Sequence, residues 1–577
     1  MTGCPDSPGP AASSQDGCPS SWDRTKISRR SVLAGLGALV AAPIIGAGRP
    51  AWAIVGPSPS PAVVPAPPVV PAAAPGTPLP GFVKWQHAVG DPRGSDVVAL
   101  YGRTTEARFG TMFKSLKPFT PDDLLLHDLA YAMTESRGPL DDIRPDGHDN
   151  LEMPSGFIYL GQFIDHDMTR DTTSLTDRRM DPHALLNFDT PQFDLGSVYG
   201  QGPLNNPELY EADGKHLLLR TNANGIEDLP RDASGSAFVG DPRNDENLII
   251  AQLQMAFIKL HNHFLEADAA GSFSRAQQLT RWHFQWVIVH DFLPHLVGQP
   301  LLDSMIMTLP DRIRAKTMFY RPGNPLRPMM PIEYSVGAYR WGHSGIRAEY
   351  EMHDFARVGT NPAVLPIFDT NSDPKTARDL RGGRPIYTDA TIDWNYFFEI
   401  PGVQSPDDTN YARLIDTEVA RPLLELPDSV VAHVSGAVLA LAERNLLRGS
   451  RLGLPSGQDV AAQMRTVMPS MPAPMTNDQL DPGGRFQLSK AGWGGQAPLW
   501  FYCLQESAVR GAGRKLGPVA GRIVAEVILG LLQLDQASYW NAPRPFVPVG
   551  GPGFRMGDLL KLAKAPIFDP RTQQPIA

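Results

Sequence analysis

The sequence predicts a mainly α-helical protein whose segment 82–577 forms one large domain. Hydrophobic residues make up 42% of the 577 residues and charged residues 20%, which is ordinary for a globular protein with a large core. After residue 81 no second proline-rich linker divides the chain. Apolar residues recur at helical spacing in four segments of this domain, 249–268, 276–297, 429–449 and 517–533.

The first 53 residues are predicted to be a twin-arginine export signal with a long polar leader. The arginine pair 29–30 precedes an apolar stretch, 34–47, which is short and rich in Gly and Ala for a membrane span, and 51–53 is a small-residue cleavage site. We expect cleavage after residue 53, then export by the twin-arginine machinery to the periplasm, the cell wall or the medium. An uncleaved N-terminal anchor is the alternative. Residues 54–81, where Pro and Ala dominate, are expected to form an extended linker.

The net charge and the cysteine content argue against nucleic-acid binding and against an intrachain disulfide in the exported protein. The net charge of −9 argues against a nucleic-acid partner, which favours basic patches. With the signal removed, Cys503 is the only cysteine of the mature chain, so no intrachain disulfide can form. Stability then depends on the helical core and on bound groups.

The tripeptide Asp165-His166-Asp167 is the most informative motif of the domain. It follows the apolar, helix-like residues 157–160, and charged groups are costly to bury without partners or a metal. On a helix Gln162 and His166 share one face, Asp165 lies close to it, and Asp167 projects elsewhere. Alone, the tripeptide fits a structural histidine as well as a catalytic one.

Three further polar clusters follow at 241–247, 339–343 and 445–449. Arg243 and Glu246 stand three residues apart just before the helix expected at 249, so both side chains can face one cavity. Pro242 with Asn244 or Asp245 is the expected start signal of that helix. No His-Glu-x-x-His motif supports a zinc hydrolase, and a structural role is expected for the remaining histidines of the central region, at 261, 263, 290 and 295.

In combination, these stretches resemble the animal-type haem peroxidase superfamily, which also contains the cyclooxygenases, and the chain looks like a bacterial member. The resemblance covers most of the chain from about residue 81 and implies a mainly α single domain around a buried haem. It rests on six motifs in the order found in the family, Gly-Gln-Phe-Ile-Asp-His-Asp at 161–167, Phe-Asp-Leu-Gly-Ser-Val-Tyr-Gly at 193–200, Gly-Asp-Pro-Arg-Asn-Asp-Glu-Asn at 240–247, Leu-His-Asn-His at 260–263, Arg-Trp-Gly-His at 340–343 and Arg-Asn-Leu-Leu-Arg-Gly at 444–449.

On the proximal side of the haem, the resemblance implies that His343 bonds the iron through Nε2. Asn445 matches the group that accepts the other ring N–H, an interaction that fixes the tautomer of a ligating histidine. Arg448 matches an arginine on the propionate side, and Arg340 is a second candidate partner because guanidinium groups recognise carboxylates.

On the distal side, the resemblance implies that His166 takes a proton from hydrogen peroxide and returns it to the departing oxygen. Arg243 stabilises the charge that develops as the O–O bond breaks, and Gln162 matches the glutamine near the halide and water site. The expected products are water and a ferryl haem that oxidises a halide, thiocyanate or a phenol. Removal of peroxide under oxidative stress and production of hypohalous acid both fit this chemistry.

Two carboxylates match the residues that form ester bonds to haem methyl groups in the family, Asp165 and Glu246. For Glu246 the alternative is a cap or salt bridge at the start of a helix. Asn247 stands where some mammalian relatives have a methionine that makes a third, sulfonium link. Asparagine cannot make that link, so bromide, iodide, thiocyanate or phenols are expected as donors rather than chloride.

The resemblance also implies a calcium ion beside the distal histidine, because calcium prefers carboxylate, hydroxyl and carbonyl oxygens. Asp167 matches one ligand, and the loop residues Thr190, Gln192 and Asp194 supply a hydroxyl, a carbonyl and a second acid. Gly196 stands where the family has a serine or aspartate, so the predicted site is weakened.

Two other functions compete with a peroxidase. Fatty-acid oxygenases on the same scaffold place a radical-forming tyrosine three residues before the proximal histidine, where this chain has Arg340, with Tyr339 one residue earlier. A secreted haem-binding or adhesion protein has no need of both His166 and Arg243. The peroxidase interpretation is therefore preferred, with hydrogen peroxide and a small electron donor as the expected partners.

Overall fold

The computed structural model describes residues 107–134, 147–169, 186–187, 191–268, 271–309, 312–323, 328–354, 363–369, 376–427, 438–569, 572 and 574–576. All of them belong to one compact unit, Gly76–Ala577. The predicted export signal, 1–53, and linker, 54–81, lie outside the described residues. Within the described part of the chain, no helix combines the length and apolar character that crossing a membrane requires.

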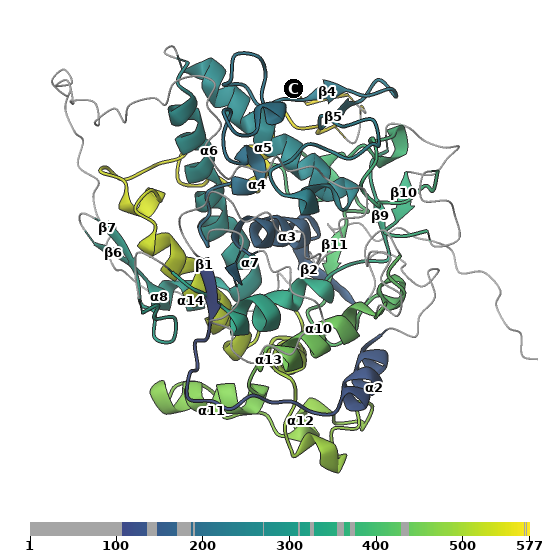
Figure 1. Ribbon diagram of the computed structural model, residues 1–577, viewed down its shortest axis with the longest axis vertical. Helices are drawn as coiled ribbons and strands as arrows, with labels where there is room; N and C mark the ends of the chain where they lie inside the picture. The colour runs from purple at the N-terminus through teal and green to yellow at the C-terminus, as the bar shows by residue number, and fades with distance from the viewer. Residues whose placement is uncertain are drawn as a thin grey trace, which may run out of the picture. The chain divides into compact units, whose positions relative to one another are not determined.

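Helices dominate the regular structure, so the mainly α prediction is confirmed (Figure 1). In the view of Figure 1, α3 lies between α4, α5 and α6 above and α10 and α13 below. The α-helices are α2 (Asp123–Met133), α3 (Gly156–Met168), α4 (Gly196–Tyr199), α5 (Leu248–Ala267), α6 (Phe273–Val287), α7 (Leu293–Val297), α8 (Gln299–Met305), α10 (Leu441–Arg451), α11 (Gly457–Val467), α12 (Asn477–Leu480), α13 (Leu499–Gly511), α14 (Pro518–Leu534) and α15 (Met556–Leu562).

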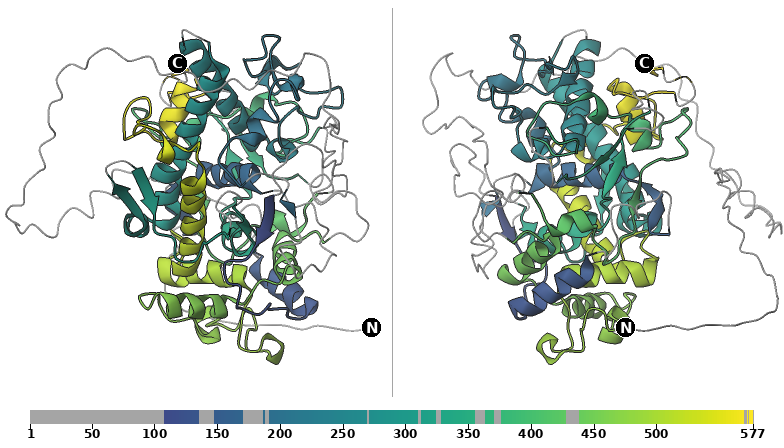
Figure 2. Two further views of the ribbon diagram at one scale, coloured as in Figure 1. Left: turned by 60° about the vertical axis from the view of Figure 1, so that its left-hand side comes forward. Right: turned by 90° about the vertical axis from the view of Figure 1, so that its right-hand side faces the viewer.

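Single-turn helices and short strands connect these helices (Figure 2). The site uses the 3₁₀ turns η4 (Pro242–Asp245) and η7 (Ala338–His343) and the π-turns η5 (Ile288–Phe292) and η6 (Glu333–Gly337). The strands are β1 (Ala107–Gly110), β2 (Asp149–Pro154), β3 (Leu186–Asn187), β4 (Arg220–Thr221), β5 (Glu227–Asp228), β6 (Ile306–Leu309), β7 (Arg312–Ala315), β8 (Met330–Pro331), β9 (Glu349–Glu351), β10 (Val364–Pro366) and β11 (Tyr411–Arg413). The largest sheet of the described residues has three strands, in the order β3-β1-β8, and the others are pairs.

Three of the four expected helical segments are found, and one needs correction. Helices α5 and α14 match the predicted segments 249–268 and 517–533, and 276–297 is helical throughout as α6, η5 and α7. The helix predicted over 429–449 begins only at Leu441. Its predicted first residues, 429–437, lie outside the described residues. Before Leu441 the chain is extended at Ala440, and the Leu439 carbonyl accepts from the Leu426 amide at 3.2 Å, which is incompatible with a helix there.

Helix α3 is the buried centre of the domain. Phe163 is 0% exposed and stacks on Phe257 of α5 with ring centroids 4.7 Å apart. Gly156 allows the close approach at its start, because a Cβ there would lie 2.5 Å from the Phe397 carbonyl oxygen. An aromatic side chain buried in this way contributes about 1.5–3 kcal/mol. Burial on nearly every side therefore fixes the direction in which the polar residues of α3 project.

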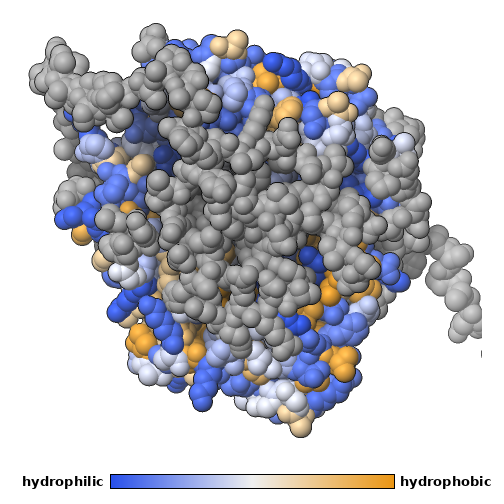
Figure 3. Space-filling view, viewed as in Figure 1, coloured by the Kyte–Doolittle hydropathy of each residue, from blue (hydrophilic) through white to orange (hydrophobic). Residues whose placement is uncertain are grey.

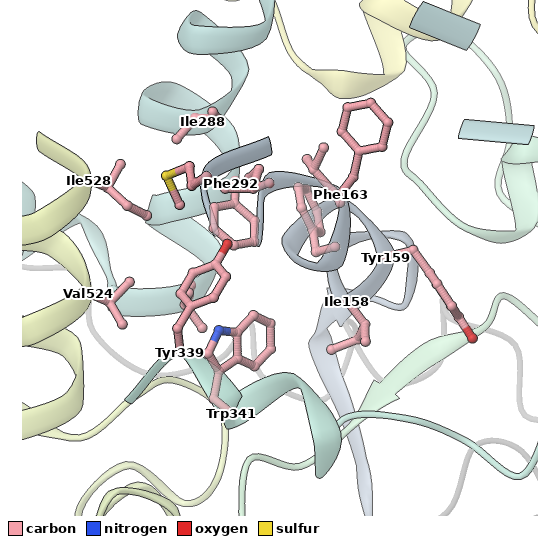
Figure 4. Packing of buried hydrophobic residues seen from close by; sticks show 14 of the residues in the cluster. Ile158, Tyr159, Phe163, Ile288, Phe292, Tyr339, Trp341, Val524 and Ile528 are labelled. Carbon is pink, nitrogen blue, oxygen red and sulfur yellow. The ribbon is translucent and has the colours of Figure 1, made fainter. Parts of the chain in front are cut away.

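The turn η7 packs against α3 through aromatic side chains. Figure 4 shows Tyr339 and Trp341 of η7 beside Phe292 of η5 and the residues of α3. The Tyr339 hydroxyl donates to the Gly161 carbonyl at 3.1 Å, and a Cβ on Gly161 would lie 3.4 Å from the Trp341 ring. These contacts place the residue that ends η7, His343, in a fixed relation to α3.

A buried ion pair anchors the chain just after η7. Arg347 and Asp149 are 0% and 1% exposed and form an ion pair, and Arg413 approaches the same carboxylate at 3.3 Å. We expect Asp149→Ala to lower the free energy of unfolding by about 3–5 kcal/mol, because two buried guanidinium groups lose their counter-charge. Urea denaturation measures the loss. Glu152→Ala is the control, since its ion pair with Arg514 is exposed and contributes at most about 1 kcal/mol; equal losses in both variants would contradict the prediction.

On the face seen in Figure 3, hydrophilic residues are interspersed with smaller groups of hydrophobic ones among the described residues. The large apolar side chains that are exposed are few, among them Leu204 and Leu124. Most of the apolar surface of the described residues therefore goes into the single core around α3.

Candidate functional site

His166 occupies the last turn of α3 and is 4% exposed. Its Nδ1 atom is 2.8 Å from Oδ1 of Asn244, and its Nε2 atom is 3.7 Å from Oε1 of Glu246. Both partners belong to the segment that starts with η4, 78 and 80 residues further along the chain. The imidazole is thus held at Nδ1 by Asn244, and its Nε2 points towards the carboxylate of Glu246.

Arg243 lies beside His166 and is held at two points. Its guanidinium group forms an ion pair with Asp241, with Nη2 and Oδ2 2.7 Å apart, and the same Nη2 donates to the His166 carbonyl at 3.1 Å. Asp241 also caps η4, because its Oδ1 accepts from the Arg243 amide at 2.8 Å. A cationic group is therefore fixed close enough to the imidazole of His166 for its charge to lower the pKa of that ring.

Gln162 and His166 share one face of α3, as the i, i+4 spacing predicts, and both approach the carboxylate of Glu246. The Gln162 amide donates to Glu246 Oε1. Asn247 reaches the same group, with its Nδ2 3.4 Å from Gln162 Oε1. Arg243 and Glu246, which the sequence places three residues apart, both contact His166.

The start signal of α5 was predicted wrongly. Asn247, rather than Asn244 or Asp245, caps the helix, and its Oδ1 accepts from the Ile250 amide at 2.9 Å. Asn244 and Asp245 lie within η4, where their side chains have other partners, His166 and Arg231. A cap on Asn247 leaves Glu246 free of that role, so the alternative interpretation of Glu246 as a helix cap does not apply.

Burial is the largest influence on the imidazole of His166. Desolvation lowers its pKa from the usual value of 6.5, and the positive charge of Arg243 lowers the pKa further. The carboxylates of Glu246, Asp241 and Asp165 act in the opposite direction. The net effect favours a neutral imidazole at pH 7, which is the form able to accept a proton.

Asp165 and Asp167 have different surroundings, as predicted. Asp165 is half-buried, and its Oδ1 accepts from the Thr169 hydroxyl at 2.9 Å. Asp167 is buried and points to the segment before α4, where its Oδ2 accepts from the Leu195 amide at 2.8 Å. Asp165 lies near Tyr339 of η7, whose pKa is raised first by burial and then by the negative charge of Asp165.

The predicted calcium ligands are only partly brought together. Thr190 lies outside the described residues, and Asp194 accepts from the Gly196 amide at 3.0 Å. The Ser197 hydroxyl lies 3.5 Å from Asp167 Oδ1, one residue after Gly196. Gln192 is half-buried beside this loop. Over the described ranges, no three His, Cys, Asp or Glu side chains converge as a metal site requires.

The second cluster of the site centres on His343, at the end of η7. Its Nδ1 atom is 2.6 Å from the Asn445 amide nitrogen, although the two residues are 102 positions apart. If the carboxamide of Asn445 turns its Oδ1 to the ring, Nδ1–H donates to it and the lone pair of the neutral imidazole is on Nε2. The indole of Trp500 meets the ring edge-on at 6.5 Å and donates to the Arg340 carbonyl. Asn445 and Trp500 also line an apolar pocket with Leu446, Leu454 and Pro498.

The two arginines near His343 differ in burial and in contacts. Arg448, one turn after Asn445 on α10, is 9% exposed, and desolvation lowers its pKa to about 10. Arg340 is half-buried, and its Nε donates to the Ser335 carbonyl at 3.0 Å. Of the two, Arg448 is the cationic group whose burial would be offset most by an incoming anion.

The four histidines expected to be structural have structural surroundings or lie away from the site. His261 bonds the Tyr199 hydroxyl and the Lys215 carbonyl, both at 3.0 Å, and burial lowers its pKa to about 4. His290 contacts the Tyr539 hydroxyl at 3.1 Å, and His295 contacts the Asp291 carbonyl at 2.7 Å. His263 packs edge-on against Phe264 on the same helix.

Comparisons with known proteins agree with this architecture. The family model for animal haem peroxidases matches residues 165–388. Peroxidase A from Dictyostelium discoideum has a similar structure, with a TM-score of 0.55, 14% identity, and coverage of 82% of this chain and 94% of the other. The fatty acid alpha-dioxygenases of Arabidopsis thaliana and Oryza sativa both give a TM-score of 0.51, at 14% and 15% identity. The match to the Arabidopsis enzyme covers 80% of this chain, and the match to the rice enzyme covers 76% of it. Each match covers 76% of the dioxygenase.

No match was found among curated protein sequences. The structural neighbours show the fold, at identities too low to transfer a substrate. The family match, by contrast, spans His166, Arg243 and His343 and includes α5 between them. Residues 165–388 are therefore similar to the animal haem peroxidase family, and the fold of the chain is similar to that of a peroxidase and of fatty acid dioxygenases.

Proposed function

We propose that this protein is a haem peroxidase that reduces hydrogen peroxide and oxidises a small donor such as bromide, iodide, thiocyanate or a phenol. The observation that supports this most strongly is the position of the Arg243 guanidinium group beside the buried His166, whose lowered pKa favours the neutral imidazole. An acid–base group beside a fixed positive charge is what heterolysis of a peroxide bond requires.

The chain's residues fit a haem. Asn445 lies 2.6 Å from Nδ1 of His343, a contact of the kind that orients a ligating imidazole, and the buried Arg448 would supply a positive charge for a propionate. Arg340 is a weaker candidate for this role, because its Nε is already bonded to the Ser335 carbonyl. Bound haem would supply the iron that binds peroxide and the redox equivalents that pass to the donor.

The residues of the chain then have distinct tasks. With haem bound, His166 Nε2 would accept a proton from hydrogen peroxide and return it to the departing oxygen, which would leave as water. Arg243 stabilises the negative charge on that outer oxygen, and its ion pair with Asp241 keeps the guanidinium group in place. Gln162 orients the carboxylate of Glu246 by donating a hydrogen bond to it.

This mechanism predicts a pH dependence. The pKa of His166 is lowered, so the rate of the peroxide reaction should stay constant near pH 7 and fall only below pH 6.5, as the imidazole is protonated. The same shift means that the folded protein loses stability as the pH falls below 6.5, because the unfolded chain binds the proton more tightly. In Arg243→Gln the fall in rate on the acid side of the pH profile should begin at higher pH, because loss of the positive charge of Arg243 raises the pKa of His166. Stopped-flow rate constants are measured against pH for the wild type and the variant. An acid limb at the same pH in both proteins would contradict the proposed role of His166 as the proton acceptor.

Steady-state assays with the haem-loaded protein test the function itself. We expect bromide, iodide, thiocyanate or guaiacol to be oxidised only when hydrogen peroxide is present. The alternative, a fatty-acid oxygenase, has support from the dioxygenase neighbours and from the buried Tyr339 beside α3. Uptake of oxygen with a fatty acid and no added peroxide would establish that alternative and overturn the peroxidase proposal.

Three finer predictions from the resemblance belong to this proposal. Ester bonds to haem through Asp165 and Glu246 are supported by the position of both carboxylates around His166. A calcium ion bound by Asp167, Thr190, Gln192 and Asp194 is a prediction that rests on the resemblance alone. Export by the twin-arginine route, with cleavage after Ala53, rests on the sequence of the first 53 residues.

A further inference from the structure

We propose that Asn244 and Gln254 are positioning residues that set the tautomer of His166. This inference rests on the proposed peroxidase role of His166 and gives Asn244 and Gln254 a role that the sequence motifs did not assign to them. The three side chains form a hydrogen-bonded relay, which we define as His166, Asn244, Gln254 and the backbone carbonyl of Ser197. Asn244 is 0% exposed and Gln254 is 1% exposed, so water does not compete for these bonds.

The direction of the relay follows from its last member. Gln254 Nε2 is 3.3 Å from the Ser197 carbonyl oxygen, and a carbonyl can only accept, so the amide nitrogen of Gln254 must face it. The other end of Gln254, Oε1, then accepts from Asn244 Nδ2 at 2.8 Å. Asn244 therefore presents Oδ1 to His166, at 2.8 Å from Nδ1. Each amide orientation is thus determined by the one before it.

A fixed acceptor at Nδ1 determines the state of the imidazole. Only a protonated Nδ1 can donate to Asn244 Oδ1, so the neutral ring has its hydrogen on Nδ1 and a lone pair on Nε2. Nε2 is the atom that faces Glu246 and the pocket of Arg243. The relay therefore keeps His166 ready to accept a proton on the side where peroxide would bind.

The relay has a rigid support. The Ser197 carbonyl also accepts from the Gly240 amide at 3.0 Å, and Gly240 has no room for a side chain because a Cβ would lie 2.4 Å from the Gly196 carbonyl oxygen. The loop before Ser197 is tied back to α3, since Leu195 donates to Asp167 at 2.8 Å. The loop that contains Ser197 is therefore anchored to Asp167 of α3, the residue next to His166.

Four variants of the haem-loaded protein test the relay. Asn244→Leu removes the acceptor, and Gln254→Leu leaves Asn244 free to turn its amide. Asn244→Asp keeps an acceptor for Nδ1 and adds a negative charge. Gln252→Leu is the matched control, because Gln252 is a buried glutamine on the same helix, bonded to the Leu248 and Ala390 carbonyls and outside the relay.

Two rates are measured against pH for each variant, that of the peroxide reaction and that of cyanide binding. Cyanide binding reads the base directly, because hydrogen cyanide gives its proton to Nε2 as the anion binds the iron. We expect Asn244→Leu to lower both plateau rates about tenfold to hundredfold, and Gln254→Leu to lower them less. Asn244→Asp should keep the plateaus and move the acid limb to higher pH, since a negative charge raises the pKa of His166. Gln252→Leu should leave both rates and the limb unchanged.

The outcomes separate the relay from the proposed function. Asn244→Leu with wild-type rates and limb, or Gln252→Leu with an equal loss, would overturn the relay, and the second result would assign a merely structural role to these amides. Wild-type protein that binds cyanide with a limb sensitive to Asn244→Asp but does not turn over peroxide would support the relay and refute the peroxidase. The haem absorption band and the melting temperature of each variant confirm that it is folded and loaded.

Discussion

Replacing His166 by alanine is expected to slow the reaction with hydrogen peroxide by about 10²–10⁴-fold at pH 7, the usual effect of removing a general acid–base group. The reason is local: Nε2 is the basic atom held towards the pocket, and Glu246, 3.7 Å away, is the neighbouring group on that side. A substitution at this position removes the proton acceptor without touching His343 or Asn445. Stopped-flow absorbance of the haem band after mixing with peroxide measures the rate constant.

Two controls make the His166→Ala result specific. His261→Gln alters a histidine that is buried to a similar degree but bonded to Tyr199 and Lys215, so it should leave the rate unchanged. The resting absorption spectrum of His166→Ala should match that of the wild type, because the axial ligand is unaffected. A variant that keeps its haem and reacts within threefold of the wild-type rate would remove His166 from the mechanism.

Replacing His343 by glycine is expected to abolish the native haem spectrum, because the proposed axial bond through Nε2 is lost. The cavity that is left should accept free imidazole, which restores the spectrum and part of the activity. The measurement is the haem absorption band during titration with haem, with and without imidazole. The Asn445 amide lies 2.6 Å from Nδ1 of His343 and orients the proposed ligand without bonding the iron. Asn445→Leu should therefore weaken haem binding less than His343→Gly does.

The control for His343→Gly is a histidine in the same domain that the structure places elsewhere. His290→Gln should load haem normally, because His290 stacks on Trp286 and contacts Tyr539 rather than the pocket. Normal loading and an unchanged spectrum in His343→Gly without imidazole would show that another residue holds the iron. That result would also refute the proposed positions of Asn445 and Arg448 around the haem.

Local spacing predicted part of this site, since Gln162 and His166 lie on one face of a helix and Asp167 on another. The pairing of His343 with Asn445 joins residues 102 positions apart, and only the resemblance to a family made it predictable. The bond between His166 and Asn244 had no sequence signal, because Asn244 was interpreted as a helix start. Which asparagine caps α5 depends on the tertiary contacts of η4 rather than on local propensity.

Two further differences have the same physical origin. The helix predicted over 429–449 does not include residue 439, because the Leu439 carbonyl accepts a hydrogen bond from the Leu426 amide instead. The Ser197 hydroxyl lies 3.5 Å from Asp167, whereas matching the motif position by position leads to Gly196. A shift of one residue in a loop is invisible to a motif and is decided by how the loop packs on α3.

The visible absorption spectrum of the purified, haem-loaded protein, recorded before and after addition of hydrogen peroxide, tests the central claim most directly. The account predicts a haem band that changes within seconds of adding peroxide and returns to its initial form when a phenol or bromide is added, over repeated cycles. A band that peroxide only bleaches, with no return on addition of any donor, would contradict the proposed peroxidase function.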